Sequence, residues 1–202
     1  SVLMSDSYIQ YHCIGEDEEQ EYGCKGTAFI LKGLGIVSAL HCFSPITVSG
    51  ITIDKSYILL DTNDKTIELC SDSISAKSYA DDWALFSTIP KELSGLPGLI
   101  AAPKRVLPQK GQRVTAYGYA EGDKVIRRID AKVLEVLNNV VIVDRAFIKG
   151  MSGGPVLNSR GEVIGLITKG SGEGSYNYDG QFVLLNAIPQ VEKKIENTII
   201  TD

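Results

Sequence analysis

The chain has 202 residues, of which 44% are hydrophobic, 25 are acidic and 20 are basic, giving a net charge of −5. This length suits one compact domain or two small ones, and the apolar fraction predicts a packed core and not a disordered chain. The mild acidity gives no electrostatic reason to expect nucleic acid or an anionic membrane as a partner. No apolar run approaches the roughly 20 residues of a membrane-spanning helix.

The first half of the chain is predicted to form short β-strands. Apolar and β-branched runs lie at 26–31, 36–40, 57–60 and 83–87, and turn signals such as Lys32–Gly33 separate them. No basic segment followed by an apolar one precedes these runs, so no signal peptide is expected. The stretch 94–103, which is rich in glycine and proline, is predicted to link this half to the next.

The second half repeats the β pattern and then changes period. Five further runs, separated by short polar or glycine-containing turns, occupy 114–119, 125–136, 140–143, 163–168 and 182–185. Many short strands at this spacing predict an all-β sandwich or barrel. Ile188, Val191, Ile195 and Ile199 recur at helical spacing around Pro189, which suits a first helical position. A C-terminal helix is therefore expected over 189–199.

A serine on a glycine-dense turn, Ser152 within Lys149–Val156, is the first candidate for chemistry. A serine hydroxyl is a poor nucleophile alone, so a catalytic one needs a base and a cradle for negative charge. The chain has two histidines, and His41 follows an apolar run whereas His12 lies in a polar stretch. Asp82, at the start of the 83–87 run, is the candidate acid, and Asp81 is a weaker alternative. Each residue taken alone is compatible with an ordinary turn, strand or capping role.

The same serine turn also satisfies the G-x-S-x-G pattern of α/β-hydrolases, over Gly150–Gly154. Those enzymes place the catalytic histidine after the serine and a helix directly behind it. No histidine follows Ser152, and residues 155–161 are typical of a short strand and a turn. The sequence therefore excludes the esterase interpretation.

Five segments resemble the trypsin/chymotrypsin-like serine proteases. Ser38–Cys42 is similar to the histidine motif of that family, Asp82–Leu85 to its aspartate motif, and Gly150–Pro155 to its serine motif. Gly26–Ile30 resembles the glycine-led strand before the histidine, and Gly165–Gly170 resembles the strand that borders the substrate. The five motifs have the family's order and spacing and span most of the chain, so together they are specific.

The resemblance implies a fold and a division of the chain. An all-β protein of two six-stranded antiparallel β-barrels, the chymotrypsin-like fold, is expected, with a C-terminal α-helix. The first barrel, residues 1–98, would carry His41 and Asp82, and the second, residues 99–202, would carry Ser152. The site would lie in the crevice between them.

The resemblance also implies a serine endopeptidase that acts without a metal or another cofactor. His41 would accept the proton of Ser152, Asp82 would orient the imidazole, and the amides of Gly150 and Ser152 would form the oxyanion hole. The reaction would pass through an acyl-enzyme intermediate. An alternative function is an inactive or partner-activated protease fold that serves as a binding module.

An extended peptide or protein is the expected substrate, added through main-chain hydrogen bonds to the edge formed by Thr168, Lys169 and Gly170. The family's spacing puts Ala146 near the floor of the pocket for the residue before the cut. Trypsin-type members carry an aspartate there, so the sequence predicts a small or apolar residue at that substrate position. Asp179, in a loop that aligns less securely, is an alternative source of charge.

Two positions depart from zymogen-type trypsins. Met151 replaces the aspartate that would pair with a newly cut N-terminus, so activation by N-terminal clipping is not expected. The pattern is closer to bacterial and viral members, including the HtrA-like group, with any regulatory domain or partner outside this chain. Lys169 stands where many members have an aromatic residue.

The four cysteines, Cys13, Cys24, Cys42 and Cys70, show no C-x-x-C spacing, which argues against a zinc or thioredoxin-type site. The resemblance implies a disulfide between Cys24 and Cys42, and this bond would indicate an oxidising, extracytoplasmic compartment. The alternative is four reduced thiols in a cytosolic protein.

Overall fold

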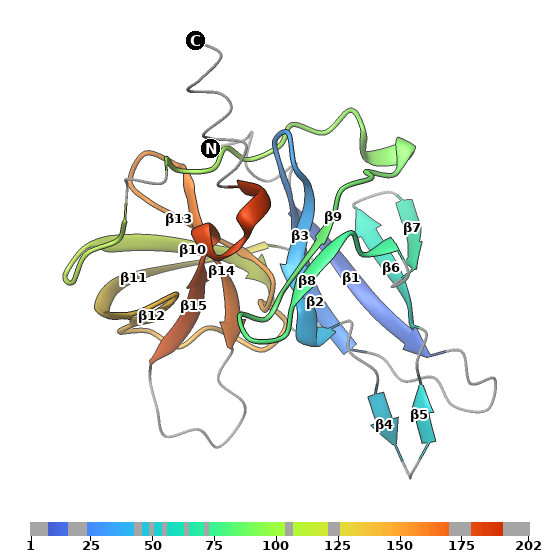
Figure 1. The fold of residues 1–202 in the computed structure, drawn as a ribbon, viewed down its shortest axis with the longest axis horizontal. Coiled ribbons are helices and arrows are strands. Elements are labelled where there is room, and N and C mark those ends of the chain that lie inside the picture. Colours follow the sequence, from blue (N-terminus) through green and yellow to red (C-terminus); the bar gives the residue numbers. More distant parts are fainter. Residues whose placement is uncertain are drawn as a thin grey trace.

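The computed structural model describes residues 8–15, 24–42, 46–48, 51–53, 56–62, 65–70, 73–103, 107–120, 126–169 and 179–191. Within 8–25 and 46–70, and at Lys169, this description covers the backbone alone. The strands form two groups, one from each half of the chain, that lie side by side (Figure 1). Within the described residues, no helix is long and apolar enough to cross a membrane.

The first half of the chain builds a seven-stranded sheet with the order β7-β6-β1-β2-β3-β9-β8, beside a two-stranded β4–β5 ribbon. Its strands are β1 (Tyr8–Gly15), β2 (Cys24–Leu31), β3 (Gly35–Ala39), β4 (Ile46–Val48), β5 (Ile51–Ile53), β6 (Ser56–Thr62), β7 (Lys65–Cys70), β8 (Ala76–Ser78) and β9 (Trp83–Phe86). Neighbouring strands run antiparallel, and β1 lies between β2 and β6 near the centre of the sheet.

This half differs from the six-stranded barrel that the family resemblance implies. Among the described residues its sheet has seven strands, and β7 and β8 stand at its two ends without pairing to each other. Strands that the sequence did not indicate, among them β1 and β7, form antiparallel ladders with β2 and β6 that satisfy their backbone hydrogen-bonding groups. The all-β class is confirmed, whereas the described residues of this half do not form a closed barrel.

The second half forms the expected closed barrel, with the order β10-β11-β12-β15-β14-β13. Its strands are β10 (Arg113–Tyr119), β11 (Ile126–Leu137), β12 (Val140–Val143), β13 (Pro155–Leu157), β14 (Val163–Lys169) and β15 (Gly180–Leu184). Alternate residues point inward, as Val141 and Val143 on β12 do, and pack with Phe147 and Phe182 in one buried cluster. A closed barrel leaves no free strand edge, and the turn that carries Ser152 lies directly before its strand β13.

The segment 99–102 ties the two halves together. Leu99 forms backbone hydrogen bonds with Ile30 of β2 and with Lys32, the residue just after β2, and the amide of Ala102 donates to the carbonyl of Val163 on β14. A shared apolar cluster lies at the same junction and includes Trp83, the one tryptophan of the chain, which is 4% exposed. The domain boundary at residue 98 stays a prediction, although every sheet strand precedes it and every barrel strand follows it.

Two other expectations extend beyond the described residues. Residues 189–191 are helical and the remainder of 189–199 lies outside the described residues, so the C-terminal helix stays a prediction. Cys42 is buried, but the side chain of Cys24 is not described, so the Cys24–Cys42 disulfide stays a prediction. The β1–β2 register places Cys13 directly opposite Cys24, which gives Cys24 a second neighbouring cysteine position.

Candidate active site

His41 lies where β3 ends against the second half of the chain. The ladder of β3 with β9 stops at Ala39, and the chain then turns through a short 3₁₀ helix, Leu40–Cys42. Leu40 and Cys42 point into the core on either side of the histidine, so the apolar neighbours fix the turn while the imidazole stays 48% exposed. The apolar spacing of the sequence therefore directs His41 toward the crevice.

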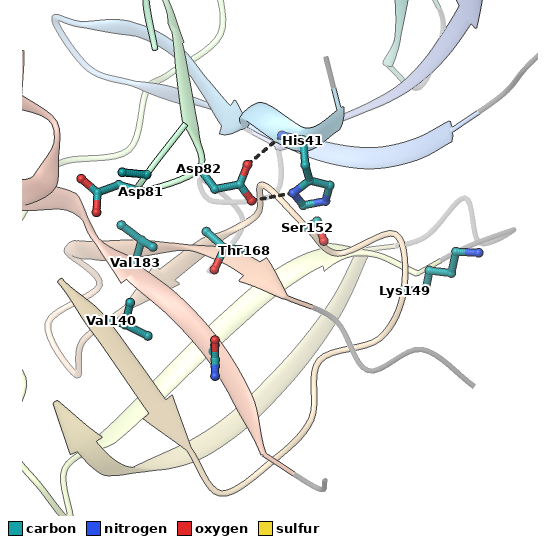
Figure 2. A pocket seen from close by; sticks show the side chains of 10 residues that line it. His41, Asp81, Asp82, Val140, Lys149, Ser152, Thr168 and Val183 are labelled. Atoms are coloured by element: carbon teal, nitrogen blue, oxygen red, sulfur yellow. Dashed lines mark hydrogen bonds and ion pairs between the residues drawn. The ribbon is translucent and has the colours of Figure 1, made fainter. Parts of the chain in front are cut away.

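Asp82 holds His41 through two hydrogen bonds. The backbone amide of His41 donates to Asp82 Oδ1 at 2.7 Å, and His41 Nδ1 lies 2.6 Å from Asp82 Oδ2 (Figure 2). Asp82 has a positive φ of 58°, a conformation that aspartate and asparagine tolerate better than most residues. Asp81 lies on the far side of Asp82 from the ring (Figure 2), so the structure pairs His41 with Asp82 and not with Asp81.

The turn around Ser152 depends on its glycines. Gly150 and Gly153 have φ values of 98° and 92°, in the left-handed region that glycine adopts without a steric penalty. A Cβ atom on Gly153 would lie 2.1 Å from the carbonyl oxygen of Thr27 and 2.4 Å from Ser38 Oγ. The amide of Gly153 also donates to the carbonyl of Ile167 on β14. The turn therefore contacts both halves of the molecule.

Thr27 on β2 connects the first sheet to this turn, and the sequence did not single it out. Its hydroxyl donates to the carbonyl of Gly150 and accepts from the amide of Tyr119, both at 2.9 Å. Its own amide donates to the carbonyl of Ser152, and the residue is fully buried. One side chain therefore fixes the orientation of the Gly150–Ser152 turn from outside the barrel.

Replacing Thr27 with valine keeps the shape of the side chain and removes its hydroxyl. We expect a loss of about 2–3 kcal/mol in unfolding free energy, because the Gly150 carbonyl and the Tyr119 amide lose a buried partner. We also expect kcat to fall about 10- to 100-fold, less than the loss of a complete oxyanion donor. Urea unfolding followed by Trp83 fluorescence, with peptide hydrolysis, measures both. Thr27→Ser is the control that should retain activity, and a fully active valine variant would contradict this role.

The amides expected to form the oxyanion hole are those of Gly150 and Ser152. Within the described part of the chain, no acceptor takes a hydrogen bond from either amide, whereas the intervening Met151 amide donates to Ile148. The Met151 side chain is fully buried in the barrel core and packs against Gly118. Met151 stands where zymogen-type trypsins carry an aspartate, and here it is a core side chain that supports the turn through packing.

A cavity of about 570 Å³ joins the candidate residues. Figure 2 shows the Ser152 side chain below the His41 ring, with Thr168 and the apolar pair Val140 and Val183 under Asp82. The residues lining this cavity are His41, Ala80, Asp81, Asp82, Val140, Lys149, Ser152, Thr168, Gln181 and Val183. Val140, Gln181 and Val183 were not identified as site residues from the sequence, because only the β12–β15 register places them beside residues from the first half.

Of the other residues predicted to bind substrate, one lines the cavity and the others do not or are not fully described. Thr168 lines the cavity, whereas Ala146 is partly buried and does not. Lys169 ends β14, with only its backbone described, and Gly170 lies outside the described residues. Asp179 is exposed and is not among the residues that line this cavity. The pocket for the residue before the cut therefore stays a prediction.

The fold and the arrangement around His41 define a protein of the chymotrypsin-like class. The sequence matches the family of the Trypsin-like peptidase domain over residues 26–166, so the chain belongs to this family. This result confirms the resemblance and supports a protease function. No curated protein sequence matches significantly.

Solved structures of bacterial and viral proteases share the fold. The active form of the Rv3671c protease from M. tuberculosis superposes with a TM-score of 0.70 at 16% identity, covering 96% of this chain and 82% of that one. A serine endoprotease from Yersinia pestis gives 0.68 at 17% identity, covering 96% of this chain and 64% of that one. A human pathogenic astrovirus serine protease gives 0.62 at 19% identity, with 90% of both chains covered.

Proposed function

We propose that this protein is a serine endopeptidase that cleaves peptide bonds through Ser152, His41 and Asp82. The observation that carries the proposal is the double hydrogen bond from His41 to Asp82, at 2.7 and 2.6 Å, beside a cavity that Ser152 also lines. A carboxylate that accepts from the backbone amide and from Nδ1 holds the ring in one orientation. This leaves Nε2 as the nitrogen available to take a proton.

Each step then has an assigned group. Nε2 of His41 removes the Ser152 proton as Oγ attacks the substrate carbonyl, and Asp82 stabilises the imidazolium that forms. The amides of Gly150 and Ser152 bind the oxyanion, His41 protonates the leaving amine, and water then hydrolyses the acyl-enzyme by the same route. The substrate lies as an extended strand along Thr168–Gly170.

A fluorophosphonate probe tests the nucleophile, because it reacts with serines that a neighbouring base activates. We expect one equivalent of probe on the native protein, mapped by mass spectrometry to the peptide containing Ser152. Urea-denatured protein is the control and should remain unlabelled, since unfolding separates Ser152 from His41. The absence of label on the native protein, or label at another serine, would favour the binding-module alternative.

The residue before the cut is expected to be small or apolar. Ala146 supplies no charge at the position where trypsin-type members carry an aspartate, so a cationic side chain gains no ion pair there. Cleavage of a peptide library with product sequencing measures this preference. Products ending mainly in lysine or arginine would contradict it and would direct attention to Asp179.

A further inference from the structure

The ladder between β1 and β2 ends on two cysteines. These neighbouring strands run antiparallel (Figure 1), and their register sets Cys13 directly opposite Cys24. The Cα atoms of directly opposite residues in an antiparallel pair lie about 4.5 or 5.5 Å apart. A disulfide bridges Cα atoms that are about 4.4–6.8 Å apart. The backbone alone therefore brings Cys13 and Cys24 to the separation that a disulfide needs.

The strand order excludes Cys70 as a partner of either residue. Cys70 ends β7, and β6 lies between β7 and β1, so Cys70 is two strands away from Cys13 and three strands away from Cys24. Neighbouring strands are about 4.8 Å apart, so two spacings amount to about 10 Å. This distance exceeds the longest Cα separation that a disulfide bridges, which is about 7 Å.

Cys42 is the partner of Cys24 that the family resemblance implies, but none of the described ladders joins these two positions. The β2–β3 ladder ends where Ala28 pairs with Ser38, which is four residues after Cys24. The strand β3 itself ends at Ala39, and Cys42 follows in a 3₁₀ helix. Among the described ladders, the one that pairs Cys24 with another cysteine is therefore β1–β2.

A covalent bond at this pair would act on the strand that supports the serine turn. Cys24 begins β2, and Thr27 on the same strand holds the turn through its hydrogen bond to Gly150. The segment 14–23 connects the two cysteines and contains five acidic residues within 16–21. Like charges in a connecting segment repel each other. This repulsion opposes closure of the β1–β2 ladder at the end where the disulfide would lie.

We propose that Cys13 and Cys24 form a redox-sensitive disulfide that fastens β1 to the start of β2 and thereby stabilises the strand that supports the serine turn. When the bond forms, the two thiols lose two protons and two electrons, and their sulfur atoms join. A disulfide oxidant such as oxidised glutathione accepts both protons and both electrons and leaves as two thiols. The bond forms whether or not the protein is a peptidase.

Mass spectrometry of the full chain identifies the bond after equilibration with oxidised glutathione and alkylation of the remaining thiols. Digestion after glutamate and lysine puts each cysteine on its own peptide. Four glutamates lie between Cys13 and Cys24, and lysines separate Cys24, Cys42 and Cys70 from one another. We expect the peptides of Cys13 and Cys24 to be linked until dithiothreitol releases them. A link between Cys24 and Cys42, any other link, or no link would overturn the proposal.

The melting temperature tests the effect of the bond on the fold. Closing a loop of this length restricts the unfolded chain, so the oxidised protein should melt roughly 5–10 °C above the reduced protein. Cys13→Ser should abolish this difference, whereas Cys70→Ser is the matched control and should retain it. Equal melting temperatures of the two wild-type forms, or a difference that survives in Cys13→Ser, would contradict the assigned bond.

Hydrogen exchange tests the connection to the serine turn. The Thr27 amide donates to the Ser152 carbonyl at 2.9 Å, so this amide exchanges only when β2 separates from the turn. Reduction of the wild-type protein should accelerate exchange at Thr27 by about tenfold or more. In Cys13→Ser the rate should be the same under oxidising and reducing conditions. An unchanged rate at Thr27 when the wild-type bond is reduced would overturn the proposed support of the turn.

Discussion

Replacing Ser152 with alanine is expected to lower kcat by about a million-fold, the size of effect that removing a catalytic serine produces elsewhere. The substitution deletes Oγ and leaves the turn in place, because the contacts that hold it are made by backbone atoms. The Ser152 carbonyl accepts from the Thr27 amide, and the adjacent Gly153 amide donates to Ile167. The loss should therefore appear in kcat with little change in stability.

Initial rates of peptide hydrolysis and Trp83 fluorescence during thermal unfolding measure these two quantities separately. Ser159→Ala is the matched control, since Ser159 is an exposed turn residue on the same half of the chain and does not line the cavity. It should have wild-type activity. Residual activity above about one thousandth of wild type in the Ser152 variant would mean that another nucleophile acts.

The strands of the second half were largely predictable from sequence because burial and periodicity coincide there. The run 140–143 is β12 as predicted, and 114–119 differs from β10 by one residue. In β12 the apolar alternation has a direct cause, since Val141 and Val143 enter the barrel core. Inward-facing residues of a closed barrel repeat every second position, which is the signal that a sequence displays.

The first half was less predictable because its strands pair without a comparable apolar pattern. The strand β1 includes Gln10 and His12, and β7 begins with Lys65–Thr66, yet both are paired along their length. Their ladders are long-range contacts that no local window of sequence contains. The same segments belong to a sheet of seven strands, so the six-stranded barrel that the family resemblance implied for this half is not observed among the described residues.

For the site, motifs identified the residues that react and missed the residues that position them. His41, Asp82 and Ser152 carry reactive groups in short segments with recognisable neighbours. Thr27 and Val140 have ordinary side chains, and their importance depends on where they meet the turn or the cavity. Thr27 lies within the glycine-led strand motif, but only the tertiary structure shows its bond to Gly150 across 123 positions.

Replacing Asp82 with asparagine is expected to lower kcat by about 10⁴-fold near neutral pH through a change in the imidazole tautomer. Asparagine has the size of aspartate and tolerates the positive φ of 58° found here, so the backbone should be retained. Its single carbonyl oxygen can accept from the His41 amide, which leaves the side-chain NH₂ group facing Nδ1. A donor at that place favours a proton on Nε2, and Nε2 then cannot accept the proton of Ser152.

Asp81→Asn is the matched control, because it removes the same charge one residue away and leaves both His41 hydrogen bonds intact. If the negative charge of this loop acted only by long-range electrostatics, the two variants would lose similar activity. If the tautomer is the cause, the kcat of Asp81→Asn should stay within a few-fold of wild type. The ¹⁵N chemical shifts of His41 should then show the proton on Nε2 in Asp82→Asn alone, and on Nδ1 in the wild type and in Asp81→Asn. Comparable losses of kcat in the two variants, with His41 still protonated at Nδ1, would refute the assignment of Asp82 as the residue that orients the base.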